Sequence, residues 1–223
     1  MSTFAPASWW RILPSQILEK IAVHSFDARH GTDTSTFAAL DGLAIASDNK
    51  RHGERYQPSP VHSLRQVLRR LGIHHADFSF VDFGSGKGRA LLIAGELPFR
   101  QVIGVEFSAE LHGRAEQNIV RYRRRAASEV TAVHADATRF NLPAGDLVLY
   151  FFNPFAHAVL HQVLANINAA LRAQPRKVIL IYLYLPDEAW LAPLYGFRLR
   201  EYWHKYYIFE HTPTPTSACS LAP

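Results

Sequence analysis

The chain has 223 residues, of which 48% are apolar and 19% are charged, and 24 Lys and Arg against 19 Asp and Glu give a net charge of +5. This composition excludes a wholly disordered chain, and a domain of this length buries enough surface to fold without disulfides. The one cysteine, Cys219, excludes an internal disulfide and a zinc site built on cysteine pairs. We expect no metal site.

The same features bear on location. The use of a single cysteine favours a reducing, cytoplasmic compartment. The best candidate for a membrane helix, residues 177–186, is shorter than the ~18 apolar residues that a bilayer requires. The N-terminus lacks the basic start and long apolar stretch of a signal peptide. We therefore expect no contact with a membrane.

Residues 1–60 form the first predicted region. Apolar residues recur at helical spacing over residues 9–26, which predicts a short helix. From residue 30 to 60 the composition turns polar, and a loop of this length is typical of either a functional lid or disorder. The candidate lid residues are Asp33, Thr34 and Tyr56.

The main predicted domain spans residues 61–211. It begins with a helix at residues 60–72, and then short apolar runs alternate with helical patterns. The predicted strands are residues 78–83, 101–107, 129–136, 146–155 and 176–186, and the predicted helices are residues 90–98, 108–127 and 156–173. This alternation indicates βαβ units and a parallel sheet, which gives a doubly wound, three-layer α/β sandwich.

Two further strands close the domain. Residues 197–203 and 205–210 are joined too tightly to hold a crossover helix, so we expect them to be antiparallel. The last residues, 212–223, are rich in Pro, Ser and Thr, and we expect a disordered tail.

A glycine-rich motif directly follows the first predicted strand. Residues 82–89 read DFGSGKGR and open a helix. A phosphate-binding P-loop needs Ser or Thr after the lysine, but Gly88 follows Lys87. A dinucleotide-binding turn needs a small residue where Arg89 stands. The motif therefore favours a ligand without a pyrophosphate.

Three polar elements follow the next three predicted strands. Glu106 lies 22 residues after Gly84 (106 − 84), close to the spacing of an acid that binds a ribose diol. Asp136 follows the third strand, where it could read an adenine edge. Asn153, stiffened by the following Pro154, could present its amide oxygen at the end of the fourth strand.

With these four elements in order, the sequence resembles the class I S-adenosylmethionine-dependent methyltransferases. The residues that carry the resemblance are DFGSGKGR, VIGVEF, HADATRF and LYFFNPF, together with the terminal strand pair. The resemblance covers roughly residues 60–210 and implies a seven-stranded Rossmann-like sheet with its last strand antiparallel. S-adenosylmethionine is the implied cofactor. The cofactor contacts implied are Asp82, Gly84, Ser85, Gly86, Gly88, Glu106, Phe107, Asp136, Ala137 and Asn153.

The resemblance also implies an acceptor site. NPF is similar to the family's Asn-Pro-Pro-aromatic motif, in which the Asn holds a target nitrogen, although this sequence has only one of the prolines. Asn153 would then orient the nucleophile and Phe155 would form an apolar wall. The segment RYQPS, residues 55–59, resembles the cofactor-covering loop of some protein lysine methyltransferases. The expected activity is methyl transfer to an N or O nucleophile of an acceptor that could be a protein, an RNA or a small molecule.

Two other functions stay open at this point. The basic run at residues 121–125 is compatible with an RNA-binding module that has lost catalysis, although we favour a solvated helix end stabilised by the helix dipole. An NAD-dependent oxidoreductase is disfavoured by Arg89. His157 and His161 stand at i, i+4, but without a third ligand we interpret them as partly exposed helix residues.

Overall fold

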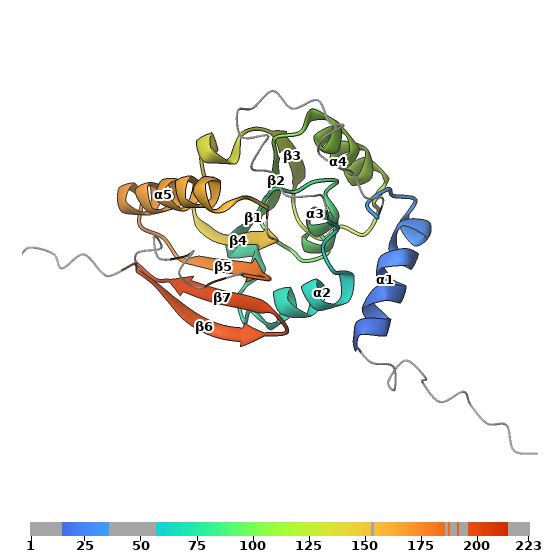
Figure 1. Cartoon of the computed structure of the whole chain (residues 1–223), viewed down its shortest axis with the longest axis horizontal. Coiled ribbons are helices and arrows are strands. Elements are labelled where there is room, and N and C mark those ends of the chain that lie inside the picture. The colour runs from blue at the N-terminus through green and yellow to red at the C-terminus, as the bar shows by residue number, and fades with distance from the viewer. Residues whose placement is uncertain are drawn as a thin grey trace, which may run out of the picture.

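The computed structural model describes residues 15–35, 57–152, 154–185, 187, 191 and 196–213. Seven strands form one sheet in the order β3-β2-β1-β4-β5-β7-β6 (Figure 1). The strands are β1 Phe78–Phe83, β2 Gln101–Glu106, β3 Val130–His134, β4 Asp146–Phe152, β5 Val178–Leu183, β6 Phe197–Trp203 and β7 Tyr206–His211. Strands β1 to β5 pair in parallel, whereas β7 pairs antiparallel with both β5 and β6. The predicted sheet is confirmed.

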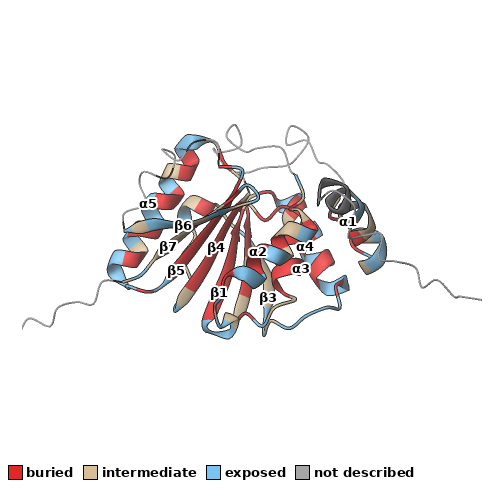
Figure 2. Cartoon of the chain, turned by 90° about the horizontal axis from the view of Figure 1, so that it is seen from below, coloured by how far each residue is buried: buried red, intermediate tan, exposed pale blue. Residues whose placement is uncertain are grey.

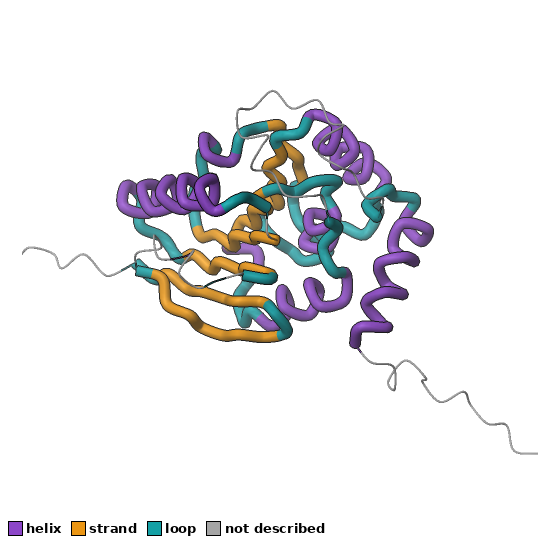
Figure 3. Tube along the Cα trace, in the orientation of Figure 1, coloured by secondary structure: helices purple, strands orange, loops and turns teal. Residues whose placement is uncertain are grey.

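The helices form a layer on each side of the sheet (Figures 1 and 3). The helix bounds are α1 Ser15–His30, α2 Val61–Arg70, α3 Arg89–Ala94, α4 Ala109–Arg121 and α5 His157–Ala173, with short 3-10 turns η4 His75–Asp77 and η5 Ala137–Arg139. Helices α2, α3 and α4 cover one face of the sheet, together with the C-terminal half of α1. Helix α5 covers the other face. The three-layer α/β sandwich is therefore confirmed.

The core has two parts, one on each face of the sheet (Figure 2). All six residues of β1 and all six of β5 are buried, as expected for parallel strands covered on both sides. Along β1, Phe80 packs with the layer that contains α2 and α3, and Val81 packs with α5. This alternation fixes the strand register, because a slip of one residue would exchange the two faces.

Three helix ends differ from the predicted ones. The first helix continues to His30 rather than residue 26. Helix α3 ends at Ala94, where Gly95 follows as its cap, rather than reaching Pro98. The helix predicted to run to residue 127 ends at Arg121, because Tyr122 is extended and its ring is buried in the same cluster as Phe26.

The predicted division at residues 60 and 61 stays a prediction, although Phe26 of α1 belongs to the same core cluster as α2. Most of the predicted lid segment and of the tail at residues 212–223 lies outside the described residues. In the parts of the chain that the structure describes, no helix combines the length and the apolar character needed to span a bilayer.

Candidate functional site

The glycine turn, residues 84–88, connects β1 to α3 at the carboxyl edge of the sheet. Gly84, Gly86 and Gly88 all have positive φ, at 78°, 54° and 84°. The backbone N–H groups of Gly84 and Ser85 donate to the carbonyl of Val105 at 2.9 and 3.1 Å, which fixes the turn against β2. Left-handed backbone strongly favours glycine, so the alternating glycines of the motif follow from the shape of this turn.

Gly84 also brings the turn into contact with the end of β4. A Cβ built on Gly84 would lie 2.5 Å from the Cβ of Pro154, so no larger residue fits. Pro154 therefore lies directly beside the glycine turn. Gly88 has a different role, since a Cβ there would lie 3.1 Å from the Cβ of Ala115 on α4.

Glu106, the last residue of β2, is the acid nearest to the turn. Its side chain accepts hydrogen bonds from the N–H of Gly86 at 2.8 Å and from the N–H of Ser108 at 2.9 Å, one to each carboxylate oxygen. The residue is only 3% exposed, and this burial raises the pKa of its carboxyl, while the hydrogen bonds from Ser108 and Gly86 partly oppose the rise. The backbone N–H of Phe107 is a third hydrogen-bond donor to this carboxylate. A carboxylate has about four lone-pair positions, so it keeps some capacity to accept from hydroxyl donors of a ligand.

Asp82 lies near Glu106 at the end of β1 and is also 3% exposed. Burial, with the charge of Glu106 as a second cause, raises the pKa of the Asp82 carboxyl well above 3.8. Burial and the charge of Glu106 both disfavour the ionised form of Asp82. A buried carboxyl in this setting suits a cationic ligand group, which would favour its ionised form.

Replacing Asp82 by Asn tests this description of the free protein. A carboxyl with a raised folded-state pKa destabilises the fold once the pH rises above its unfolded value of about 3.8. We therefore expect Asp82→Asn to raise the melting temperature at pH 8, and we expect the gain to disappear as the pH falls toward 4. Thermal unfolding across this pH range is the measurement. Asp77→Asn, at an exposed carboxyl, is the control, and an Asp82→Asn curve parallel to wild type at all pH values would contradict the expectation.

Comparison with known proteins finds a similar domain over the part of the chain that forms this edge. A sequence profile described as a methyltransferase domain matches residues 81–174, which include the glycine turn, Glu106, Asp136 and the NPF loop. This part of the chain is therefore similar to a methyltransferase domain. No curated protein matches its sequence.

Solved structures similar to this chain share its fold at low sequence identity. A predicted N6-adenine-specific DNA methylase from Listeria monocytogenes is 13% identical with a TM-score of 0.53, over 70% of this chain and 52% of that chain. Magnesium protoporphyrin IX methyltransferase from Synechocystis, solved with bound S-adenosylmethionine, is 14% identical with a TM-score of 0.50, over 89% of this chain and 96% of that chain. The PH0226 protein from Pyrococcus horikoshii is 15% identical with a TM-score of 0.50, over 69% of this chain and 89% of that chain. These likenesses show the fold alone.

Four more of the predicted cofactor residues, Ser85, Phe107, Asp136 and Ala137, lie along the same edge. One carboxylate oxygen of Asp136 accepts from the N–H and the hydroxyl of Thr138 and so caps η5, which begins at the buried Ala137. The carbonyl of Phe107 accepts from His134 at 3.0 Å. The hydroxyl of Ser85 lies close to Gly104 on β2, so this side chain faces the sheet.

The predicted acceptor residues are only partly described. Asn153 and Tyr56 lie outside the described residues. Phe155 is 5% exposed and packs in the core cluster on the α5 face with Phe83 and Phe151. Its catalytic role stays a prediction.

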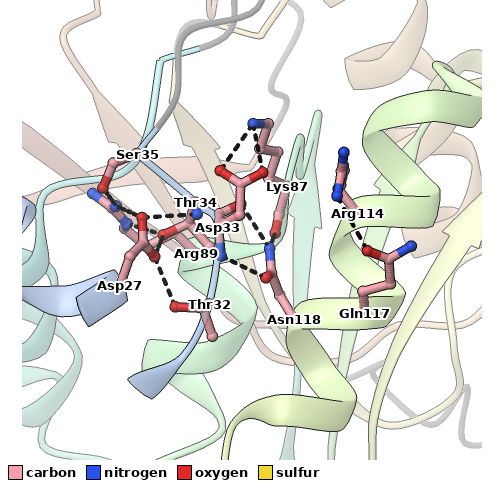
Figure 4. A network of polar contacts seen from close by, with 10 residues as sticks. All are labelled: Asp27, Thr32, Asp33, Thr34, Ser35, Lys87, Arg89, Arg114, Gln117 and Asn118. Carbon is pink, nitrogen blue, oxygen red and sulfur yellow. Dashed lines mark hydrogen bonds and ion pairs between the residues drawn. The ribbon is translucent and has the colours of Figure 1, made fainter. Parts of the chain in front are cut away.

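Asp33 and Thr34, the predicted lid residues, lie beside the glycine turn (Figure 4). Lys87 reaches the Asp33 carboxylate at 3.3 Å and is 6% exposed, so it is not the solvated residue that the start of a helix would suggest. Arg89 is 1% exposed and bonds to Thr34, which gives it a partner within the fold. Sequence reasoning missed Asn118, although an Asn among the buried positions of an amphipathic helix was an available signal.

Two further sequence features lie away from this edge of the sheet. Helix α4 starts beside Glu106, and its 13 residues place the basic run that follows it on the order of 20 Å away. RNA binding by the basic run stays a prediction. At this distance the basic run is not part of the candidate site. The rings of His157 and His161 are 3.9 Å apart, and no group of three or more metal-ligating side chains occurs among the described residues.

Proposed function

We propose that this enzyme transfers the methyl group of S-adenosylmethionine to a nitrogen or oxygen nucleophile, and that the cofactor lies across the ends of β1, β2 and β3. The observation that carries the proposal is the hydrogen bond from Gly86 to Glu106, which joins the glycine turn to a buried acid one strand away. Ligands of open α/β sheets bind at this edge, outside the carboxyl ends of the strands.

The residues present fit each part of the cofactor. The carboxylate of Glu106 suits a ribose diol, because a carboxylate can accept from both hydroxyl groups. The buried carboxyl of Asp82 suits the cationic methionine end. Asp136 and Ala137 lie one strand further on, where the adenine would lie.

The chain's contribution to the reaction is alignment and the exclusion of water. When bound, the cofactor supplies a methyl group already activated by the positive charge on sulfur. The glycine turn and Glu106 would hold the donor, and the loop containing Asn153 would orient the nucleophile in line with the methyl group. Holding two reactants in line removes much of the entropic barrier to a bimolecular step.

Asn153→Ala tests the acceptor side. We expect kcat to fall roughly 10- to 100-fold, because a misplaced nucleophile loses the benefit of alignment. The dissociation constant for S-adenosylmethionine should change much less. Asn141→Ala, at an exposed asparagine before β4, is the control. Equal losses in cofactor binding and turnover would contradict a role specific to the acceptor.

A protein is the acceptor that we propose first, on the resemblance of RYQPS to the loop of protein lysine methyltransferases. The end of this segment is attached to the sheet, since Ser59 is buried and accepts a hydrogen bond from the Tyr150 hydroxyl at 3.3 Å. The similar structures include a predicted DNA methylase and a porphyrin methyltransferase, so their acceptors differ.

Incubation of the enzyme with tritiated S-adenosylmethionine and fractionated cell extract identifies the acceptor class. We expect the label in protein, in a form that survives nuclease treatment and is lost with protease. Label confined to RNA or to small molecules would contradict a protein acceptor while keeping the methyltransferase activity.

A further inference from the structure

Residues 27–35, here called the docking segment, comprise the last turn of α1 and the residues that follow it, and they pack against the glycine turn and α4 (Figure 4). The segment is held in shape by Asp27. Its carboxylate accepts from the hydroxyl of Thr32 at 2.7 Å and from the N–H and hydroxyl of Thr34 at 2.9 and 2.7 Å. A turn fixed by three short hydrogen bonds presents one defined surface to the domain.

Arg89 is the first residue of α3 and directly follows the glycine turn. Its side chain binds the docking segment. Its Nε donates to the Thr34 hydroxyl at 2.7 Å, and its Nη2 donates to the Ser35 hydroxyl at 2.5 Å and lies 3.4 Å from the Asp27 carboxylate. The guanidinium also lies over the ring of Phe26, 5.3 Å from the ring centroid. A guanidinium with 1% exposure requires such partners, because an unpaired buried charge is strongly unfavourable.

Asn118 of α4 joins the docking segment to the glycine turn through one side chain. Its amide oxygen accepts from the N–H of Asp33 at 2.8 Å, and its amide nitrogen donates to the carbonyls of Asp33 and Lys87, both at 3.0 Å. Asn118 is 1% exposed. The turn is therefore held on one side by Glu106, through Gly86, and on the other side by Asn118, through Lys87.

We infer that Asn118 and Arg89 are positioning residues for cofactor binding, and that the docking segment is a structural part of the cofactor site. The inference rests on the proposed function. A turn with three glycines has many accessible conformations, so its shape must be imposed by its neighbours. The contacts of Asn118 and Arg89 select the shape in which Gly86 meets Glu106, and a preformed site avoids the entropic cost of ordering the turn when the cofactor binds.

Asn118→Ala tests the inference, with Asn168→Ala as a matched control, because Asn168 is a buried asparagine on α5, on the opposite face of the sheet. Thr34→Val is a second variant of nearly equal volume that removes the hydroxyl bonded to Arg89. We expect Asn118→Ala and Thr34→Val each to raise the dissociation constant for S-adenosylmethionine at least fivefold. We expect kcat at saturating cofactor to stay within twofold of wild type. Asn168→Ala should leave cofactor affinity unchanged even if it lowers the melting temperature.

Hydrogen exchange of the cofactor-free protein provides a readout that does not depend on activity. The amides of residues 84–88 should lose protection in Asn118→Ala and Thr34→Val, while those of β5 keep it. Unchanged protection, or lost protection with unchanged cofactor affinity, would overturn the inference. Wild-type enzyme that fails to bind S-adenosylmethionine would overturn the proposed function, and the inference with it. Normal wild-type binding with unchanged variants would overturn the inference alone.

Discussion

Glu106→Gln is expected to weaken S-adenosylmethionine binding by about 1–3 kcal/mol, or roughly 5- to 150-fold. The two oxygens of Glu106 accept from two different backbone N–H groups, those of Gly86 and Ser108. Glutamine keeps the volume but presents an amide NH₂ to one of these donors. The same change removes the bidentate acceptor that would bind a ribose diol. Calorimetric titration with S-adenosylmethionine and with S-adenosylhomocysteine measures the loss, and both ligands should be affected because both carry the ribose.

Glu110→Gln is the matched control for this variant. Glu110 is an exposed acid in the first turn of α4, four residues further along the chain, so it carries the same change in net charge. We expect it to bind the cofactor as wild type does. If Glu106→Gln also titrates like wild type, Glu106 does not bind the cofactor.

Gly84→Ala is expected to destabilise the enzyme strongly and to abolish cofactor binding at ordinary concentrations. The left-handed backbone, with φ at +78°, costs about 1–2 kcal/mol for a residue with a Cβ. The new Cβ would lie 2.5 Å from that of Pro154, and overpacking of this kind adds roughly 1–3 kcal/mol. To avoid the collision with Pro154, the glycine turn would have to move away from the end of β4. This movement would separate the glycine turn from the loop that follows β4.

Gly31→Ala separates these two contributions. Gly31 also has positive φ, at +67°, but a Cβ built there has nothing within 4 Å. It therefore carries the backbone cost without the collision. Thermal unfolding should show a clearly larger loss for Gly84→Ala than for Gly31→Ala. Equal losses would mean that the contact between the glycine turn and Pro154 has no energetic importance.

The sequence predicts the sheet well because periodicity and chain direction determine most of it. Buried parallel strands are continuous apolar runs, so residues 78–83 were identified with the bounds that β1 has. The closing pair was antiparallel as expected, because its connection is too short for a crossover. Helix ends were less accurate, as at Tyr122, where a tertiary contact rather than local sequence ends the helix.

The candidate site was predictable only where it follows the strands. The glycine turn, Glu106 and Asp136 each lie at or just beyond the end of a strand, and the structure places them along one edge. The contacts of Lys87 and Arg89 could not be predicted in the same way. Their partners lie 54 and more residues earlier in the chain, and no local pattern pairs residues at that separation. Asn153, central to the predicted acceptor site, lies outside the described residues.

A crystal structure of the enzyme with S-adenosylhomocysteine tests the site most directly. The account predicts both ribose hydroxyl groups within hydrogen-bonding distance of the Glu106 carboxylate, with the amino-acid end of the ligand against the glycine turn. A ligand bound elsewhere, or a Glu106 carboxylate that contacts only Gly86 and Ser108 while the ribose lies against another strand, would contradict it.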